Sequence, residues 1–235
     1  MAALLVELDP ALLSSVVRAL AQFDIREVKP YPNVSAFLNT HIWLFDAPVG
    51  SPIGPLATVP GIKYAEPDEE HIYVNCGLHP HSVGALGTRH LSLGAEVSAL
   101  QSSLPEIMAQ IGVPQALAKS NGGEGVVILV VDSGVDDDRV PPERRAGGWT
   151  DDPSGDPWED DTGHGSMVAT IALAVAPNAK VFSVRLRPGP NGGLMKESVM
   201  SAVDALIPLV QANPDMQLVM NNSWGTGGCN GEPYW

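Results

Sequence analysis

The chain has 235 residues, of which 44% are hydrophobic and 17% are charged, which is typical of a globular protein rather than a disordered, fibrous or membrane one. Thirteen lysines and arginines stand against 27 aspartates and glutamates, so the formal net charge is −14. A protein of this charge repels phosphate backbones and anionic lipids, and we expect no nucleic-acid partner and no membrane partner.

The first residues do not predict an export signal. Met1 to Asp9 lacks the basic start of a secretory signal peptide and already contains Glu7 and Asp9. We therefore expect a cytoplasmic protein. The only two cysteines, Cys76 and Cys229, suit a reducing compartment, although a single disulfide bridge stays open.

Residues 1–76 predict a small α+β domain. Leu4 to Leu8 is typical of a strand, and Asp9 is expected to cap a helix that begins with Pro10. Further strands are predicted over Ile25 to Leu38, Ile42 to Phe45 and Ile62 to Tyr64, with a short helix over Ile53 to Thr58. Helices packed on one face of a small antiparallel sheet, in a ferredoxin-like arrangement, fit this order.

Residues 77–95 are rich in glycine, histidine and serine without periodicity, and they predict an interdomain linker. The histidines of this region, His71, His79 and His81, are too loosely spaced to predict a metal site, so no metal ligands are assigned. The second predicted domain covers residues 96–235 and opens with two short helices, which begin at Pro105 and Pro114.

The second domain alternates strands with helices. Apolar runs without alternation, which indicate buried parallel strands, occur at Val126 to Val131, Val181 to Leu186 and Leu218 to Met220. Met167 to Ala176 is apolar all round and predicts a covered helix, and Met195 to Val210 predicts an amphipathic helix that Pro208 should kink or shorten. Residues 136–161 predict an acidic, turn-rich loop. The fold class is therefore α/β, an open parallel sheet with helices on both faces.

Polar residues follow these strands at the edge where open parallel sheets bind and react. Asp132 ends the first strand, and His164 begins the apolar helix. A carboxylate held by its strand can accept the imidazole N–H, fix its tautomer and stabilise the imidazolium, so we expect the two side chains to touch. Taken singly, each residue also fits a simpler interpretation, as a turn-capping aspartate or a helix-start histidine bonded to backbone.

These stretches resemble the subtilisin-like serine proteases, or subtilases. GVVILVVDSGV resembles the aspartate block of the family, GHGSMVAT its histidine block and MNNSWG its substrate-binding strand. AVAPNAKVFSVRL and IGVPQALAKSNGGEGV resemble the segments that follow the histidine helix and precede the aspartate strand. The N-terminal part, ending in VPGIKYAEPDEEHIYV, resembles the inhibitor-type propeptide of these enzymes.

The resemblance implies a role for each matching residue. Asp132 would be the orienting carboxylate and His164 the general base, while Ser223, Trp224 and Gly225 would pair with an extended polypeptide substrate. Trp224 is expected to line a side-chain pocket. Ser166 and Met167 stand where the family usually has threonine and histidine, which leaves His164 in place.

The nucleophile of the family lies in a Gly-Thr-Ser-Met-Ala block, after a separate block with the oxyanion-hole asparagine, and neither occurs before Trp235. We therefore expect a complementary C-terminal segment to supply the serine, and this chain alone to be inactive. Ser166, Ser223 and Cys229 are disfavoured as replacements. Ser166 would point away from the ring, while Ser223 and Cys229 belong to the substrate strand and a glycine-rich loop.

Two functions stay open. The first is a subtilisin-like serine endopeptidase, here as a zymogen-like part that carries the aspartate and histidine. The second is a non-catalytic binding or regulatory module that docks a partner on an exposed sheet edge. No cofactor is expected; the resemblance alone allows calcium in the acidic loop, for which a solvated loop is the favoured interpretation.

Overall fold

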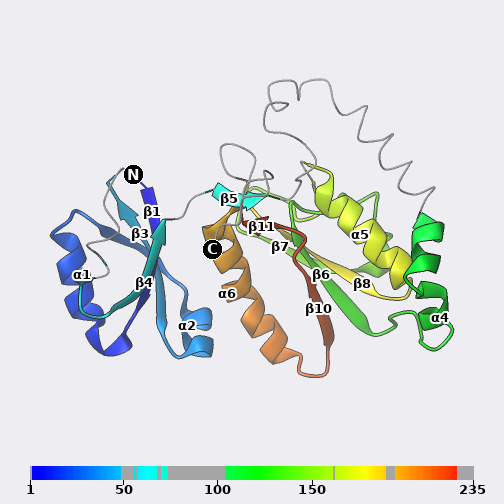
Figure 1. The fold of residues 1–235 in the computed structure, drawn as a ribbon, viewed down its shortest axis with the longest axis horizontal. Helices are drawn as coiled ribbons and strands as arrows, with labels where there is room; N and C mark the ends of the chain where they lie inside the picture. The colour runs from blue at the N-terminus through cyan, green and yellow to red at the C-terminus, as the bar shows by residue number, and fades with distance from the viewer. Residues whose placement is uncertain are drawn as a thin grey trace, which may run out of the picture. The chain divides into compact units, whose positions relative to one another are not determined.

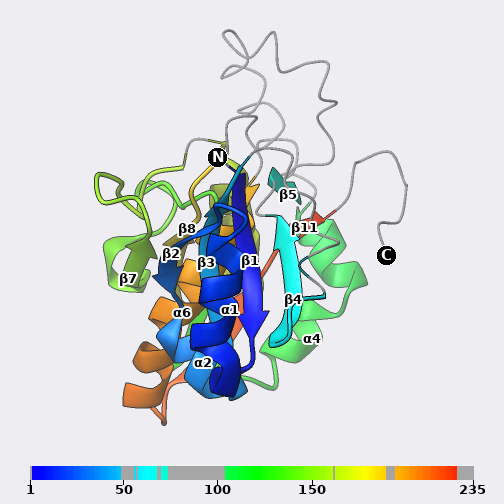
Figure 2. The ribbon, with the colours of Figure 1, turned by 90° about the vertical axis from the view of Figure 1, so that its left-hand side faces the viewer.

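A computed structural model describes residues 2–48, 56, 58–67, 70–73, 104–160, 162–188 and 194–226 (Figures 1 and 2). By its internal contacts the chain divides into two compact units. Unit 1 contains Met1–His71 and Gly189–Pro214, and unit 2 contains Ile72–Pro188 and Asp215–Trp235. The predicted linker over residues 77–95 lies outside the described residues, as do Cys76 and Cys229.

Unit 1 is built on a four-stranded antiparallel sheet in the order β2-β3-β1-β4. Its strands are β1 (Ala2–Leu8), β2 (Arg26–Pro30), β3 (His41–Ala47) and β4 (Ile62–Pro67). β1 pairs antiparallel with both β3 and β4, and β2 pairs antiparallel with β3. This is the ferredoxin-like strand order that the sequence predicts. Of the predicted helix at Ile53 to Thr58, only residues 56 and 58 are described.

The first helix begins as expected. Asp9 Oδ1 accepts a hydrogen bond from the Ala11 N–H at 2.9 Å, and Pro10 takes the first position, where its missing N–H costs nothing. A 3-10 turn (η1, Pro10–Leu12) continues into α1 (Leu13–Ala21). Val16 and Leu20 of α1 are fully buried in the main core of unit 1.

The predicted strand over Ile25 to Leu38 is wrong in its second half. β2 ends at Pro30, and a helix, α2, occupies Pro32–Leu38. The valine and aromatic residues of this stretch favour a strand by composition. Pro32 at the first helical position and Asn39 in the left-handed region at φ 52° bound the helix instead, and its open N-terminus is capped from a distant helix.

That distant helix is α6 (Lys196–Ala212), which follows the two-residue strand β9 (Leu194–Met195). Met200, Val203 and Ile207 of α6 pack against a small core that includes Val34 of α2. Lys196 pairs with Glu66 of β4 at 2.7 Å, and Glu197 pairs with Lys29 of β2. Residues from opposite ends of the sequence therefore share one hydrophobic core.

Pro208 does not shorten α6, which runs on to Ala212. A proline in a helix has no N–H for the carbonyl four residues earlier, here that of Asp204. The side-chain amide of Asn33 donates to this carbonyl at 2.9 Å. The freed acceptor is therefore satisfied from α2, and the helix continues.

Unit 2 is built on a four-stranded sheet in the order β10-β6-β8-β7, with every pair parallel. Its strands are β6 (Val126–Asp132), β7 (Arg145–Thr150), β8 (Lys180–Arg185) and β10 (Gln217–Asn221). β6 and β8 lie in the middle, and their aliphatic residues, such as Val130 and Val181, are fully buried. The predicted α/β class with a parallel sheet is confirmed.

Two strands of this sheet differ from the prediction. β7, with the 3-10 turn η4 (Pro142–Arg144) before it, lies inside the segment predicted as a loop, because its glycine-rich sequence carries no apolar run. β10 was predicted to be buried, yet Val219 is 53% exposed and Met220 47%. Within the described residues β10 pairs only with β6, so it is an edge strand.

The helices of unit 2 include residues 104–110, α4 (Val113–Leu117) and α5 (His164–Val175), which packs on β6. The sequence predicts that α5 is covered on all sides. In the structure, only residues of its first half are buried, and Val175 is 38% exposed. A short strand, β5 (Glu70–Tyr73), pairs antiparallel with β11 (Gly225–Thr226) through Ile72 and Tyr73. Among the helices of the described residues, none has the length and apolar character to span a bilayer.

Candidate active site

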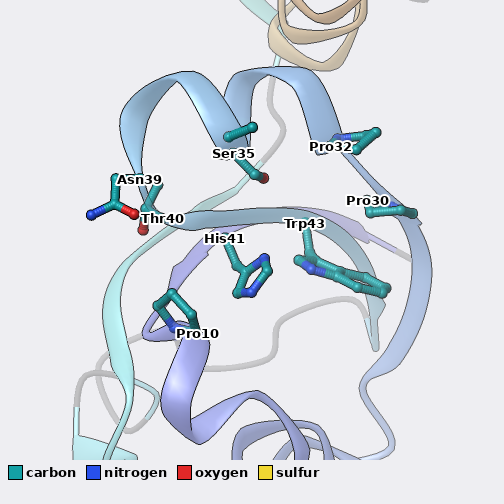
Figure 3. A pocket seen from close by; sticks show the side chains of 9 residues that line it. Pro10, Pro30, Pro32, Ser35, Asn39, Thr40, His41 and Trp43 are labelled. Carbon is teal, nitrogen blue, oxygen red and sulfur yellow. The ribbon is translucent and has the colours of Figure 1, made fainter.

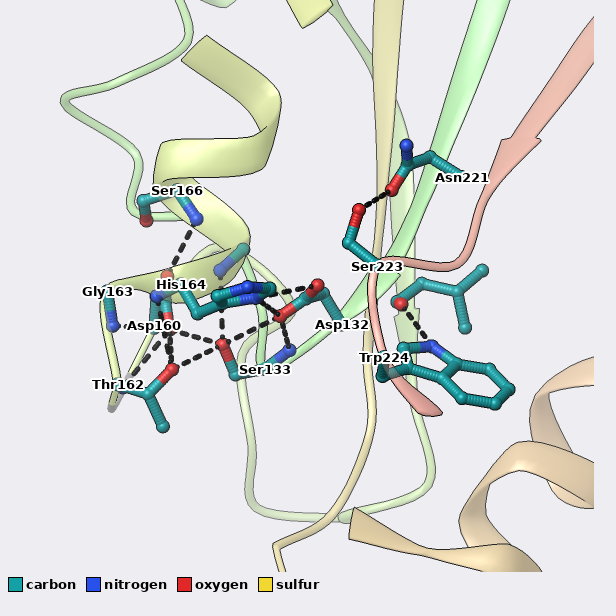
Figure 4. Close-up of polar contacts among 12 residues, drawn as sticks. Asp132, Ser133, Asp160, Thr162, Gly163, His164, Ser166, Asn221, Ser223 and Trp224 are labelled. Atoms are coloured by element: carbon teal, nitrogen blue, oxygen red, sulfur yellow. Dashed lines mark hydrogen bonds and ion pairs between the residues drawn. The ribbon is translucent and has the colours of Figure 1, made fainter. Parts of the chain in front are cut away.

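Asp132 and His164 are in contact at the carboxyl edge of the parallel sheet, as the sequence predicts (Figure 4). His164 Nδ1 lies 2.9 Å from Asp132 Oδ1 and 3.0 Å from Oδ2. Asp132 ends β6 with a fully buried side chain, and His164 begins α5 with a side chain that is 10% exposed. Because a carboxylate only accepts, the Nδ1 of the neutral ring carries the proton, and Nε2 keeps the lone pair.

Nε2 of His164 has no hydrogen-bond partner among the residues that the structure describes. The hydroxyl of Ser166 instead accepts from the Asp136 N–H at 2.8 Å, and that of Ser223 donates to Asn221 Oδ1 at 2.6 Å. Neither serine contacts the ring, and Cys229 lies outside the described residues. The imidazole is thus held by a carboxylate through Nδ1, and its second nitrogen is unbonded within the described residues.

Two glycines let the end of β6 and the start of α5 meet. A Cβ on Gly165 would lie 2.0 Å from the Gly134 carbonyl oxygen and 3.1 Å from the Cβ of Asp132. A Cβ on Gly134, which has φ +106°, would lie 2.0 Å from the Glu159 carbonyl oxygen. A side chain at position 165 would therefore push the start of α5 away from the end of β6, and one at position 134 would push the backbone at Glu159 away.

Sequence reasoning did not single out three polar residues that surround the pair: Ser133, Asp160 and Thr162. Asp160 accepts hydrogen bonds from backbone N–H groups at the start of α5, and the Ser133 hydroxyl lies between Asp160 and Asp132 (Figure 4). Asp160 lies three positions before the N-cap residue Gly163, so the usual capping pattern, an acid directly before the helix, did not indicate it.

Asp136 belongs to the same surroundings. Its carboxylate accepts the Asp160 N–H at 3.0 Å, and its own N–H donates to Ser166. Burial raises the pKa of Asp136 above its ordinary value, and the charges of Asp160 and Asp138 raise it further, against the lowering effect of the Asp160 N–H and of Arg139.

The predicted substrate residues lie on the segment after β10. The Trp224 indole N–H donates to the carbonyl oxygen of Val131 at 2.8 Å, which ties this segment to the residue before Asp132 (Figure 4). Gly225 lies opposite Tyr73 in the antiparallel pair of β11 and β5. The backbone after Ser223 therefore already has an extended strand beside it, while its role toward a substrate stays a prediction.

Within the described residues, neither a metal ligand set nor a hollow in unit 1 offers an alternative site. Across the residues with described positions, no three histidine, cysteine, aspartate or glutamate side chains are grouped as metal ligands would be, and calcium in the acidic loop stays a prediction. A hollow of about 410 Å³ in unit 1 is lined by three prolines together with small polar residues, His41 and Trp43 (Figure 3). Asp46, the nearest acid along β3, is not among its lining residues.

A parallel α/β sheet with a buried aspartate at one strand end, bonded to a histidine at the next helix start, is the arrangement that the resemblance to the subtilases implies, with the aspartate before the histidine in the chain. The model of the subtilase family, Peptidase_S8, matches residues 123–234 of this chain. This segment contains Asp132, His164 and Ser223 to Gly225, makes up just under half of the chain, and is similar to the subtilase family of proteases.

Several curated protein sequences are similar to this chain. A subtilase-type proteinase of the sexual differentiation process in Schizosaccharomyces pombe is 30% identical over 162 residues, which cover 64% of this chain and 34% of that protein. An alkaline protease of Alkalihalobacillus alcalophilus is 30% identical over 130 residues, 49% of this chain and 33% of the protease. The chain thus spans about a third of the length of these relatives.

Among solved structures, fervidolysin from Fervidobacterium pennivorans, a keratinolytic enzyme related to subtilisin, superposes with a TM-score of 0.49 at 17% identity. The superposition covers 95% of this chain and 36% of fervidolysin.

Proposed function

We propose that this chain is the part of a subtilisin-like serine endopeptidase that carries the general base and its orienting acid, and that a complementary C-terminal segment supplies the nucleophilic serine. One observation carries the proposal. His164 Nδ1 is bonded to the buried Asp132 at 2.9 Å, while Nε2 has no partner within the described part of the chain. A base held in this way has its lone pair directed at a group still to be supplied.

In the completed enzyme, Nε2 of His164 would take the proton of the serine hydroxyl as its oxygen attacks the peptide carbonyl carbon. The same proton would pass to the leaving amine as the C–N bond breaks and the acyl-enzyme remains. A water molecule would then attack the acyl carbon with His164 again as base, releasing the carboxylate product. Asp132 would stay ionised throughout and stabilise each imidazolium that forms.

We further propose that Ser223 to Gly225 binds the polypeptide substrate as an added strand. Main-chain hydrogen bonds give affinity in this mode of recognition. The antiparallel pairing of Gly225 and Thr226 with Tyr73 and Ile72 supports it, because an extended segment of the chain itself lies there. The first 76 residues would then act as a propeptide whose last strand occupies the place of a substrate.

The proposal is tested with a fluorophosphonate probe, which labels a serine activated by a neighbouring base. The full-length protein from the same gene should be labelled, its His164→Ala variant should not, and residues 1–235 alone should stay unlabelled. A Ser154→Ala variant, which alters an exposed loop serine, is the matched control and should label like the parent. Lack of labelling in the full-length protein, or full labelling without His164, would overturn the proposal.

A second candidate, the non-catalytic binding module, is favoured by the exposed edge strand β10 with Val219 and Met220. Intact-mass analysis of the purified full-length protein separates the two. A second polypeptide that co-purifies with a protein the probe does not label supports the binding module over the protease.

A further inference from the structure

We propose that Asp160 is a positioning residue of this site, which holds the histidine end of α5 and keeps the Ser133 hydroxyl proton away from Asp132. The consequence for catalysis rests on the proposed function. The geometric part of the proposal stands on hydrogen bonds among described residues and can be tested in this chain without any nucleophile.

The first element is the start of α5. Asp160 Oδ1 accepts from the Gly163 N–H at 2.9 Å and the Thr162 N–H at 3.1 Å, and Oδ2 accepts from the Ser166 N–H at 2.8 Å. These donors lie on both sides of His164 in the sequence. The N-cap residue itself, Gly163 at φ 77°, has no side chain to accept them. One carboxylate therefore fixes the turn that carries the imidazole, at the end of the helix where negative charge is favoured.

The second element is the Ser133 hydroxyl. Its oxygen lies 2.7 Å from Asp160 Oδ1 and 3.2 Å from Asp132 Oδ1. A serine hydroxyl has one proton and can donate to only one of the two carboxylates, and the shorter contact favours Asp160. The Thr162 hydroxyl, 2.7 Å from Ser133 Oγ, can then donate to Ser133.

The location of the Ser133 hydroxyl proton affects the strength of the Asp132–His164 hydrogen bond. With the Ser133 proton on Asp160, the donors to Asp132 Oδ1 among the described residues are the Ser133 N–H at 2.8 Å and His164 Nδ1 at 2.9 Å. Without the Asp160 charge, the hydroxyl would turn to Asp132 and compete with the imidazole. Hydrogen bonds to a carboxylate weaken it as an acceptor for the next donor, so the imidazole would be held less firmly.

The surrounding loop fixes Asp160 in turn. Its N–H donates to the carboxylate of Asp136, whose N–H donates to Ser166 Oγ on α5. Hydrogen bonds donated by the backbone N–H groups of Asp136 and Asp160 thus connect the acidic loop to α5. This part of the loop therefore holds the start of α5 in position.

The first test observes His164 directly in residues 1–235 by NMR with labelled histidine. The hydrogen-bonded Nδ1 proton should give a resolved downfield signal, which Asp160→Asn should shift upfield or broaden beyond detection. Adding Ser133→Ala to Asp160→Asn should restore much of the signal, because the competing hydroxyl is gone. A residue that only capped the helix would give no such rescue. Asp152→Asn, which removes an exposed acid bonded to Ser154, should change nothing.

The second test measures kinetics in the full-length enzyme. Asp160→Asn should lower kcat by about 10- to 100-fold with KM nearly unchanged, since Asp160 orients the base and does not touch the substrate strand. If Asp160→Asn does not fold, Asp160→Ser replaces it, because serine caps helices without a charge, and the same loss of signal is expected.

An unchanged Nδ1 signal in a folded Asp160 variant, or an unrescued double variant, would overturn the proposal. An inactive full-length protein would overturn the proposed function instead, and the NMR result would still decide the role of Asp160.

Discussion

Asp204 caps a helix that lies 170 positions earlier in the chain. Its Oδ1 accepts the N–H groups of Asn33 and Val34 at 2.8 and 2.9 Å, and its carbonyl oxygen accepts the Asn33 side-chain amide. The first turn of α2 therefore depends on α6 for the partners that a local N-cap usually supplies.

Asp204→Ala should destabilise unit 1 by about 1 kcal/mol, the usual cost of losing an N-cap. Hydrogen exchange should show it locally, as faster exchange of the Asn33 and Val34 amides, while urea unfolding gives the total change. Asp215→Ala removes an exposed acid from the turn after α6 and serves as the control. If the Asn33 and Val34 amides exchange as slowly in the Asp204 variant as in the parent, the cap does not contribute to stability.

Pro208→Ala should weaken the coupling between Asn33 and Asp204. Alanine restores an N–H that competes for the Asp204 carbonyl, so Asn33→Ala should cost about 0.5–1 kcal/mol less in the alanine background than in the parent, within the range for residues in one network. A double-mutant cycle by urea unfolding measures this difference. Additive effects of the two substitutions would mean that the amide of Asn33 does not depend on the proline.

Gly165→Ala should lower the free energy of unfolding by about 3 kcal/mol, the upper end of the range for overpacking. The reason is that the new Cβ would lie 2.0 Å from a backbone oxygen. It should also abolish probe labelling of the full-length protein, since α5 must move away from β6. Gly125→Ala is the matched control: at φ +82° with open space around it, it should cost about 1 kcal/mol for backbone strain alone and leave labelling intact.

Under the proposed function, Asp132→Asn should leave the fold in place and lower kcat of the full-length protein by about 10⁴-fold, the loss known when an amide replaces the triad carboxylate and stabilises the wrong imidazole tautomer. The change is read from the rate of peptide hydrolysis and from the loss of the His164 Nδ1 proton signal in this chain. Asp46→Asn, on β3 of unit 1, should leave both unchanged. A kcat within tenfold of the parent would contradict the proposed role of Asp132.

The raised pKa of Asp136 should make the free energy of unfolding depend on pH. Because burial raises its pKa in the folded state, the unfolded chain releases this proton at lower pH, and the folded state loses stability as pH rises from about 4 to the raised pKa. Asp136→Asn keeps an oxygen for the Asp160 N–H and removes the charge. Its unfolding free energy should fall less than that of the parent over this range, as measured by urea unfolding at several pH values. If the unfolding free energies of the parent and the Asp136→Asn variant change by the same amount over this pH range, the prediction is wrong.

The sequence predicted those features that local chemistry decides. Uninterrupted aliphatic runs marked β6 and β8, and Asp9 with Pro10 marked the first helix, because burial on both faces and capping leave direct traces in composition. The Asp132–His164 contact followed from strand ends meeting at one sheet edge.

The missed features depend on partners that are distant in sequence. α2 takes its cap from Asp204, and the effect of Pro208 is offset by Asn33, so neither could be inferred from neighbouring residues. β7 is held by pairing with β8 despite its glycines, and the exposure of β10 depends on which strands lie beside it.

The position of α6 has a consequence for any maturation of this protein. The helix lies within the segment that matches the subtilase family, yet its core and ion pairs join it to residues 1–71. Hydrolysis of the backbone between residues 74 and 103 would therefore leave two polypeptides in a noncovalent complex. Their separation would be governed by a dissociation constant, and a further event, such as digestion of the smaller piece, would be needed to complete it.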